Sequence, residues 1–156
     1  MWSITYNDGS LICCSDDKGL IRIHLKDNYI TPVVRCSLPP CSYFTTNGNN
    51  IYYTNNAIHK VTCCNMNGKV QWEFGDTNVQ VQPSGITTDN NNNIYVVGLE
   101  SHNVVVTSPD GQSHKVLLSH CDGLCLRCCD RASNQLLLID GRDNAGLLYD
   151  ISTTSI

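Results

Sequence analysis

Short runs of apolar and β-branched residues alternate along the whole chain with polar stretches that are rich in asparagine, glycine and aspartate. The segment 85–118 shows this best: four apolar runs of four or five residues are separated by polar turns, one of which is Ser108-Pro109-Asp110-Gly111. Runs of this length between turn-forming residues are typical of β-strands, and no stretch has the spacing of a long amphipathic helix. The pattern therefore predicts an all-β protein.

The same order of strands and turns recurs along the sequence. The second strand of each unit begins at Leu11, Ile51, Ile94 and Leu136, which are 40, 43 and 42 residues apart. A period of about 40–45 residues with four strands per unit is the signature of a β-propeller blade. We therefore expect one propeller region over residues 1–156, with about four blades of four antiparallel strands each, at 1–41, 42–84, 85–125 and 126–151.

The last unit is shorter than the others, because its third strand ends near Ile151 and only residues 152–156 follow. Blade 4 is therefore expected to lack its outer strand, and the chain opens directly on an inner strand. An unpaired edge strand is a template for pairing with another chain. We expect part of a larger propeller, most simply a six-bladed one. By itself it would form an open arc, or self-associate through its open blade edge, instead of closing as a ring of four.

The third unit resembles an NHL repeat. Its segments Pro83-Ser84-Gly85-Ile86, Asn93-Ile94-Tyr95-Val96-Val97 and Asp110-Gly111 follow that family's order of Pro-x-Gly-Ile, Asn-Ile-Tyr-Val and an Asp-Gly turn. Asn92 and Gly98 stand where glycine and aspartate are usual in the family.

The second unit matches the NHL pattern less closely, through Asn50-Ile51-Tyr52-Tyr53 and Asn67-Gly68, and the first and fourth units share only the phase. We expect Gly68 and Gly111 to have positive φ in tight turns between the third and fourth strands. Trp72, on the predicted outer strand of blade 2, is expected to pack between blades.

Within this family the chain is similar to the C-terminal propellers of tripartite-motif (TRIM) ubiquitin ligases, particularly the invertebrate ones. Those proteins carry RING, B-box and coiled-coil parts before the propeller, and this sequence has no RING-like series of Cys-x-x-Cys pairs. The resemblance implies a non-enzymatic protein-interaction module in a ubiquitin-ligase context, with any ligase activity in domains absent from this chain. It implies a protein or peptide partner, with single-stranded RNA as the alternative.

Charge and hydropathy exclude some classes of function. Lys and Arg number 10 against 14 Asp and Glu, for a net charge of −4, which argues against a nucleic-acid binder driven by electrostatics. No apolar run approaches the length of a membrane span, and the first residues do not form a signal peptide. We therefore expect a cytoplasmic protein that does not bind membranes.

The chain is rich in cysteine, with ten, and three pairs are vicinal: Cys13-Cys14, Cys63-Cys64 and Cys128-Cys129. Neighbours on a strand point to opposite faces, so such pairs are poorly placed for an ordered set of disulfides. We expect mostly free thiols in a reduced, intracellular protein; the alternative is a secreted protein with bridges. Cys36 and Cys41 flank two prolines, where loop packing is favoured over a redox pair.

Cys121, Cys125 and Cys128 are weak zinc candidates, because Cys125-x-x-Cys128 has the spacing of a zinc knuckle. A second knuckle is absent from the sequence, so packing of small buried residues is favoured and no metal or other cofactor is expected. The predicted inner strands contribute threonine and cysteine to the central channel, and no Ser-His-Asp arrangement or pair of catalytic carboxylates stands out. A propeller hydrolase with a channel metal remains a second alternative.

Binding residues concentrate on loops that a rigid scaffold holds in place. In a propeller, the loops between second and third strands share one face, and here those loops carry more acidic than basic residues. This excess fits either ordinary solvated loops or a recognition surface for a basic or polar peptide. The candidate partner-binding residues on this face are Asp16, Asp17, Lys18, Asn55, Asn56, Glu100, Ser101, His102, Arg142 and Asp143.

Overall fold

The computed structural model describes residues 4–15, 17–120, 124–130, 132–140, 145–152, 154 and 156, with the backbone alone for 124–128 and 140. These residues form fifteen β-strands and one short 3-10 helix, and no α-helix occurs among them. The prediction of an all-β protein is confirmed. No helix in this part of the chain is long and apolar enough to span a membrane.

The strands form four antiparallel sheets, each in chain order, which are the blades. Blade 1 consists of β1 (Ile4–Asn7), β2 (Ser10–Ser15), β3 (Gly19–His24) and β4 (Ile30–Val34). Blade 2 consists of β5 (Phe44–Asn47), β6 (Asn50–Asn55), β7 (Lys60–Asn65) and β8 (Val70–Phe74), with the 3-10 helix η1 (Asn56–Ile58) between β6 and β7.

Blade 3 consists of β9 (Pro83–Thr88), β10 (Ile94–Gly98), β11 (Asn103–Thr107) and β12 (His114–Ser119). Blade 4 has three strands, β13 (Leu124–Asp130), β14 (Gln135–Asp140) and β15 (Ala145–Asp150). The expected absence of an outer strand in this blade is confirmed for the described residues.

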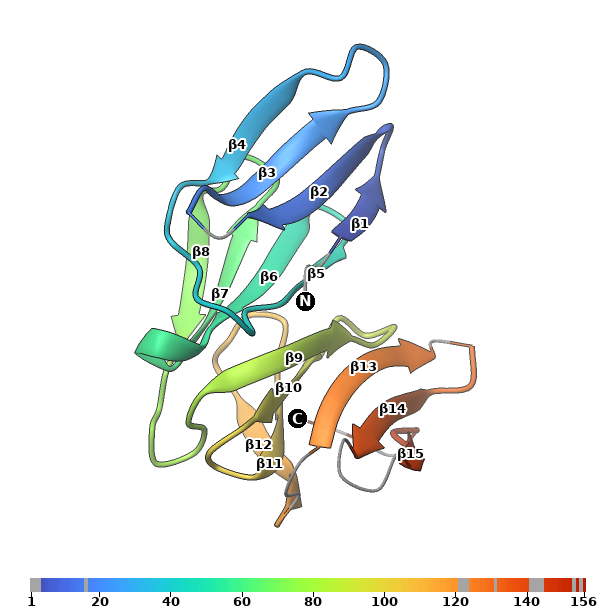
Figure 1. The fold of residues 1–156 in the computed structure, drawn as a ribbon. Helices are drawn as coiled ribbons and strands as arrows, with labels where there is room; N and C mark the ends of the chain where they lie inside the picture. The colour runs from blue at the N-terminus through green and yellow to red at the C-terminus, as the bar shows by residue number, and fades with distance from the viewer. Residues whose placement is uncertain are drawn as a thin grey trace.

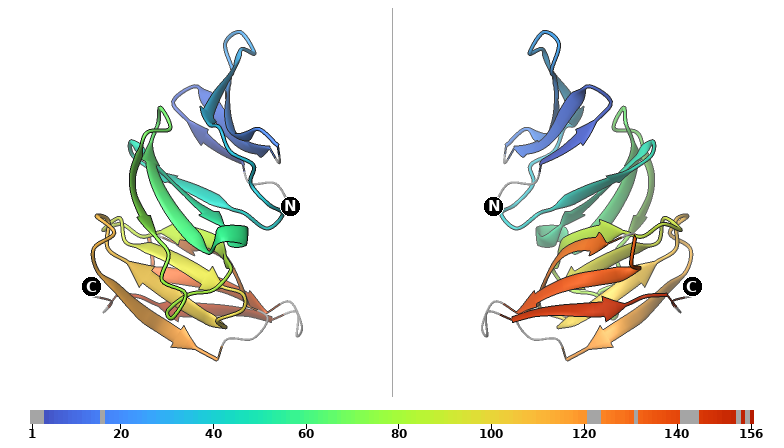
Figure 2. Two further views of the ribbon diagram at one scale, coloured as in Figure 1. Left: turned by 90° about the vertical axis from the view of Figure 1, so that its left-hand side faces the viewer. Right: turned by 90° about the vertical axis from the view of Figure 1, so that its right-hand side faces the viewer.

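The blades follow one another along an arc, with blade 1 and blade 4 at its two ends (Figures 1 and 2). Three hydrophobic clusters join blade 1 to blade 2, blade 2 to blade 3, and blade 3 to blade 4. Among the described residues, no such cluster joins blade 1 to blade 4. The fold is therefore a partial β-propeller, and the six-bladed ring stays a prediction.

Alternation along each middle strand explains how one sheet takes part in two interfaces. Tyr53 and Cys64 lie in the cluster with blade 1, whereas their neighbours Tyr52 and Cys63 lie in the cluster with blade 3. The vicinal cysteines therefore face opposite ways, as predicted. None of the seven cysteines whose side chains are described forms a disulfide: Cys13, Cys14, Cys36, Cys41, Cys63, Cys64 and Cys129.

Tight turns between third and fourth strands pack against the outer strand of the preceding blade. Gly68 has φ +78° and Gly111 has φ +73°, which confirms the predicted turns. A Cβ atom on Gly68 would lie 1.7 Å from the Val33 carbonyl oxygen, and one on Gly111 would lie 2.6 Å from the Trp72 ring. The Trp72 Nε1–H also donates to the Pro109 carbonyl at 3.0 Å. Trp72 therefore packs between blades, as expected.

Candidate functional site

The loops predicted to bind a partner lie at one end of blades 2 and 3. The β6–β7 loop, which contains η1, and the β10–β11 loop lie on the left in Figure 1, whereas the β5–β6 and β9–β10 turns lie on the right. The segment 75–82, which connects β8 to β9, runs between the two loops on the left. We call this end of the two blades the loop end.

Gln82 links the two loops at the loop end. Its backbone N–H donates to His59 Nδ1 at 3.0 Å, at the end of the β6–β7 loop. Its side-chain Nε2–H donates to Glu100 Oε1, and its carbonyl accepts from the Leu99 N–H at 3.0 Å. Three hydrogen bonds through one residue therefore hold the two loops in a fixed relation.

The β10–β11 loop is further fixed from inside. Ser101 Oγ accepts from the Val81 N–H at 3.0 Å and donates to Asn103 Oδ1 at 2.8 Å. Asn103 Nδ2–H in turn donates to the Val79 carbonyl at 2.7 Å. A Cβ atom on Gly98 would lie 2.0 Å from Ser101 Oγ, so this packing needs a glycine there. The Ser101 hydroxyl is therefore occupied within the loop, and Glu100 and His102 are its exposed side chains.

The other predicted residues that the structure describes lie at the β6–β7 loop and at the β2–β3 loop of blade 1. Asn56 Nδ2–H donates to the Pro40 carbonyl at 2.9 Å, which ties the β6–β7 loop to the segment that enters blade 2. Asn55 Oδ1 is buried and has no hydrogen-bond partner among the described residues. Asp17 and Lys18 are exposed and lie away from the loop end, on blade 1. Asp16, Arg142 and Asp143 lie outside the described residues.

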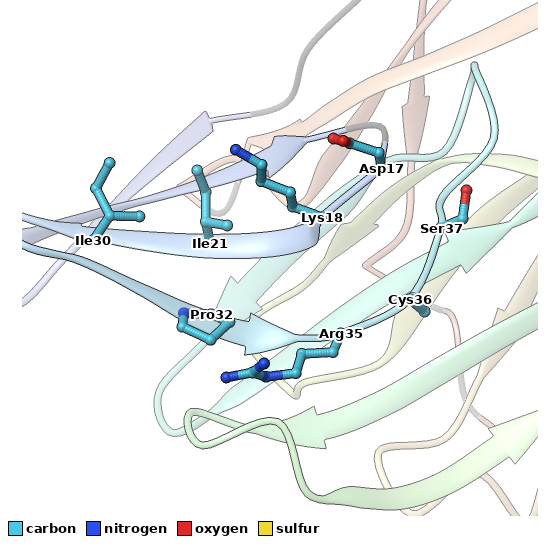
Figure 3. Close-up of a pocket in the computed structure, with 8 residues that line it drawn as sticks. All are labelled: Asp17, Lys18, Ile21, Ile30, Pro32, Arg35, Cys36 and Ser37. Atoms are coloured by element: carbon cyan, nitrogen blue, oxygen red, sulfur yellow. The ribbon is translucent and has the colours of Figure 1, made fainter.

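Asp17 and Lys18 border a pocket of about 490 Å³ on blade 1. Figure 3 shows the eight lining residues, which are Asp17, Lys18, Ile21, Ile30, Pro32, Arg35, Cys36 and Ser37. Two cationic side chains and one carboxylate border the pocket, so the surface around it is not acidic. Burial raises the pKa of the Cys36 thiol above its ordinary value of 9.0.

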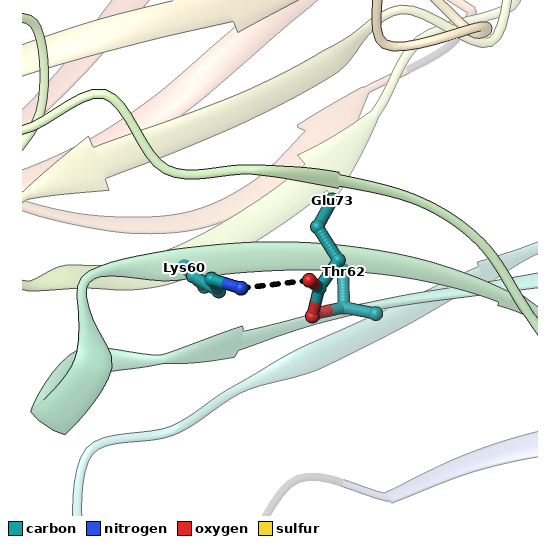
Figure 4. A network of polar contacts seen from close by, with 3 residues as sticks. All are labelled: Lys60, Thr62 and Glu73. Atoms are coloured by element: carbon teal, nitrogen blue, oxygen red, sulfur yellow. Dashed lines mark hydrogen bonds and ion pairs between the residues drawn. The ribbon is translucent and has the colours of Figure 1, made fainter.

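A second polar cluster lies beside η1, on blade 2. Lys60 Nζ pairs with Glu73 Oε2 at 2.7 Å, and the Thr62 hydroxyl donates to Glu73 Oε1 at 3.4 Å (Figure 4). This is the sole salt bridge among the described residues. The carboxylate is already paired and about half exposed, so it is not arranged as a catalytic acid or base.

The described residues contain no group of three or more His, Cys, Asp or Glu that could hold a metal ion. Of the zinc candidates, Cys121 lies outside them, as do the side chains of Cys125 and Cys128. In the channel, Thr87 Oγ1 accepts from the Cys129 N–H at 3.2 Å and so joins blade 3 to blade 4.

The buried thiols of blade 2 are unsuited to nucleophilic chemistry. Burial raises the pKa of Cys63 to about 11 and that of Cys64 to about 12. Because the thiolate is the nucleophile, both residues are unreactive at neutral pH.

The sequence pattern missed a buried carboxylate at the opposite end of blade 3. Asp89 Oδ1 accepts from the Asn91 and Asn93 N–H groups at 2.8 and 2.9 Å, and Oδ2 accepts from Asn93 Nδ2 at 2.8 Å and from the Tyr95 hydroxyl at 3.0 Å. Burial, then the charge of Asp89, raises the pKa of Tyr95. The available signal was Asp followed by Asn four and Tyr six residues later.

Comparisons with known proteins agree with this architecture. A β-propeller repeat family, SBBP, matches residues 71–99, which run from β8 to the end of β10. No protein among those with curated descriptions matches the chain. Since the family match covers a minor part of the chain, it supports the repeat and not membership of a particular propeller family.

Solved structures with a similar fold include the following three. A structural-genomics protein of unknown function from Bacteroides thetaiotaomicron has a TM-score of 0.77 and 15% identity, covering 95% of this chain and 46% of its own. A chain of a nidogen/laminin complex has a TM-score of 0.70 and 22% identity, covering 93% and 56%. Virginiamycin B lyase from Staphylococcus aureus has a TM-score of 0.66 and 18% identity, covering 97% and 56%.

The chain therefore spans about half the length of these proteins. At such low identities the likeness shows the fold alone, because propellers with unrelated functions share this architecture. The chain is part of a β-propeller, a fold compatible with a protein-interaction module.

Proposed function

We propose that this chain is a non-enzymatic recognition module that binds a protein or peptide through the loop end of blades 2 and 3. The observation that supports the proposal is Gln82, which fixes the β6–β7 and β10–β11 loops to each other. Loops that are already ordered lose little conformational entropy on binding, so more of the contact energy remains as affinity.

The loop end favours a basic or polar partner. Glu100 is exposed and oriented by Gln82, and His102 lies exposed two residues later. Asp76 lies on the connecting segment, where its Oδ1 accepts from the Asn78 N–H at 2.9 Å. Two carboxylates on a rigid surface attract a cationic peptide and repel a phosphate backbone, so RNA is the less favoured partner here.

The wider context that we propose is a TRIM-like ubiquitin ligase, in which this module selects the substrate. This rests on the resemblance of residues 83–111 to an NHL repeat. The matched chain of the nidogen/laminin complex has the same fold and was solved as part of an assembly between two proteins. Any ligase chemistry would belong to other domains.

Selection from a displayed peptide library tests the proposal directly. The purified chain is used as bait, and enriched peptides are measured by fluorescence anisotropy against the wild type, Glu100→Lys and the matched control Asp8→Lys. Asp8 is an exposed carboxylate in the β1–β2 turn of blade 1, away from the loop end. We expect lysine- or arginine-containing peptides that bind the wild type and Asp8→Lys equally but bind Glu100→Lys at least about tenfold more weakly.

Two results contradict the proposal. Enriched peptides that bind Glu100→Lys as tightly as the wild type would place the binding surface elsewhere. Salt-sensitive binding of a single-stranded RNA oligonucleotide, with no enriched peptide, would favour the RNA alternative.

A further inference from the structure

Equivalent positions of the repeat show what covers each face of a blade. Alternate residues of the second strand of a blade face the preceding blade: Ile51 and Tyr53 in blade 2, Ile94 and Val96 in blade 3, and Leu136 and Leu138 in blade 4. All six are buried. The equivalent residues of blade 1 are Leu11 and Cys13, and no blade among the described residues packs on them.

Blade 1 therefore carries a blade-packing face without a blade on it. Directly paired residues of adjacent strands share a face, and the rows through Leu11 and Cys13 are apolar across the whole sheet. They are Tyr6, Leu11, Ile23 and Ile30, and Ile4, Cys13, Ile21 and Pro32. Ile4, Tyr6 and Ile30 are 62%, 66% and 55% exposed. The pocket in Figure 3 adjoins this face, because Ile21, Ile30 and Pro32 line it together with Asp17, Lys18, Arg35, Cys36 and Ser37.

Blade 4 carries the complementary face at the other end of the arc. Middle-strand residues that face the following blade are Ile12 in blade 1, Tyr52 in blade 2, and Tyr95 and Val97 in blade 3. Their equivalents in blade 4 are Leu137 and Ile139. Leu148, which pairs with Leu137 across the sheet, is 66% exposed. Contiguous exposed apolar side chains on a protein surface mark an interaction site.

We propose that these two faces bind each other between copies of this chain, with blade 4 of one copy packed on blade 1 of the next. The contact continues the three blade–blade interfaces already inside the chain, between the same repeat positions. A second copy carries both faces, so no foreign protein is required. Two head-to-tail contacts between two copies close a ring of eight blades, within the range of about 4–8 known for propellers. If the chain were longer, additional blades of the same chain could pack on these faces of blade 1 and blade 4.

Light scattering coupled to size-exclusion chromatography tests the proposal on the 156-residue chain. At about 0.1 mM, where a contact of micromolar affinity is saturated, we expect twice the 17.3 kDa of one chain. Ile30→Asp on blade 1 and Leu148→Asp on blade 4 each place a charge in both contacts of the ring and should give monomers. Both residues are already exposed, so the fold should survive, which circular dichroism checks. The control is Ile58→Asp, because Ile58 is 56% exposed in η1, away from both faces, and this variant should remain a dimer.

Mixing the two monomeric variants separates head-to-tail pairing from other arrangements. The mixture can form a dimer with one unaltered contact, so it should associate at least about tenfold more tightly than either variant alone. A monomeric wild type overturns the proposal, as does an open series of larger oligomers. A dimer that Leu148→Asp leaves intact would mean pairing through blade 1 alone and would also overturn it.

Discussion

Blade 3 and blade 1 have the same four-stranded plan but are buried to different extents. Every residue of β9, β10 and β11 in blade 3 is buried. In blade 1, no residue of β1 is buried, and β2 buries two of its six. Within the described part of the chain, blade 3 has a neighbour on each side, whereas blade 1 has one only on the side of blade 2. Burial in a propeller is therefore a property of the stack of blades and not of a strand by itself.

The turn between the first and second strands, β9–β10 in blade 3 and β1–β2 in blade 1, also differs in burial between the two blades. In blade 3, the Asp89 carboxylate accepts four hydrogen bonds in a buried site next to Tyr95. In blade 1, the equivalent turn is exposed, and the Gly9 N–H donates to the Tyr6 hydroxyl at 3.1 Å. The blade that best matches the repeat pattern is also the one whose turn is locked by buried polar contacts.

The largest difference is expected from equivalent core positions. Ile94→Ala in blade 3 should reduce the free energy of unfolding by about 2–5 kcal/mol, because it leaves a cavity between two blades. Leu11→Ala at the same repeat position in blade 1 should cost about 1 kcal/mol or less. Urea denaturation measures both, in a Leu148→Asp background that keeps the face of blade 1 uncovered. Equal losses would mean that Leu11 is packed in solution.

A second difference concerns two glycines with nearly equal φ, +73° at Gly111 and +69° at Gly9. A Cβ atom on Gly111 would meet the Trp72 ring at 2.6 Å, whereas one on Gly9 would meet nothing within 4 Å. Gly9→Ala should therefore cost only the backbone strain, about 1 kcal/mol, and Gly111→Ala about 1–3 kcal/mol more for the clash. Melting temperatures measure the difference. Equal shifts would show that Trp72 moves aside freely.

The buried thiols predict a pH dependence. Burial raises the pKa of Cys64 in the folded protein to about 12, from the ordinary value of 9.0. Between pH 9 and 12, the Cys64 thiol therefore stays protonated in the folded protein but loses its proton in the unfolded chain. The contribution of the protonated Cys64 thiol to the free energy of unfolding is complete below pH 9, and it is lost as the pH rises from 9 towards 12.

In the wild type, the free energy of unfolding should decrease between pH 9 and 10, and Cys64→Ala should make this decrease smaller by up to about 1 kcal/mol. Cys13→Ala, on the open face of blade 1, should reduce it by less. Denaturant titrations across this pH interval measure both slopes. If Cys64→Ala has the same dependence of stability on pH as the wild type, Cys64 is not buried between blades 1 and 2 in solution.

The smallest effect is expected on the outer part of blade 2. Lys60 and Glu73 are 40% and 42% exposed, so solvent screens their ion pair (Figure 4). Glu73→Gln should change the free energy of unfolding by about 0.5 kcal/mol or less. Added salt should narrow any difference between the variant and the wild type. A larger effect would mean that this strand, like those of blade 3, is covered in solution.

Much of the fold was predictable because its signals are local. Asn67-Gly68 and Asp110-Gly111 specify tight turns within a few residues, and the vicinal pair Cys63-Cys64 must face both ways on a strand. The site was less predictable. The residues of the β10–β11 loop could be named as a candidate surface, but Gln82 could not, because it reaches the loop from a segment 18 residues earlier.

The sequence by itself determined where strands and turns lie and how often the unit repeats, since turn chemistry and alternation act between near neighbours in the chain. Only the tertiary structure decided which faces are buried. Trp72 covers Gly111 from 39 residues away, and Tyr95 faces Leu136 of the next blade. Ile4, Tyr6 and Ile30 of blade 1 follow the same alternation as the strands of blade 3, and yet they stay exposed. Burial requires a second surface, and a strand's own residues cannot supply it.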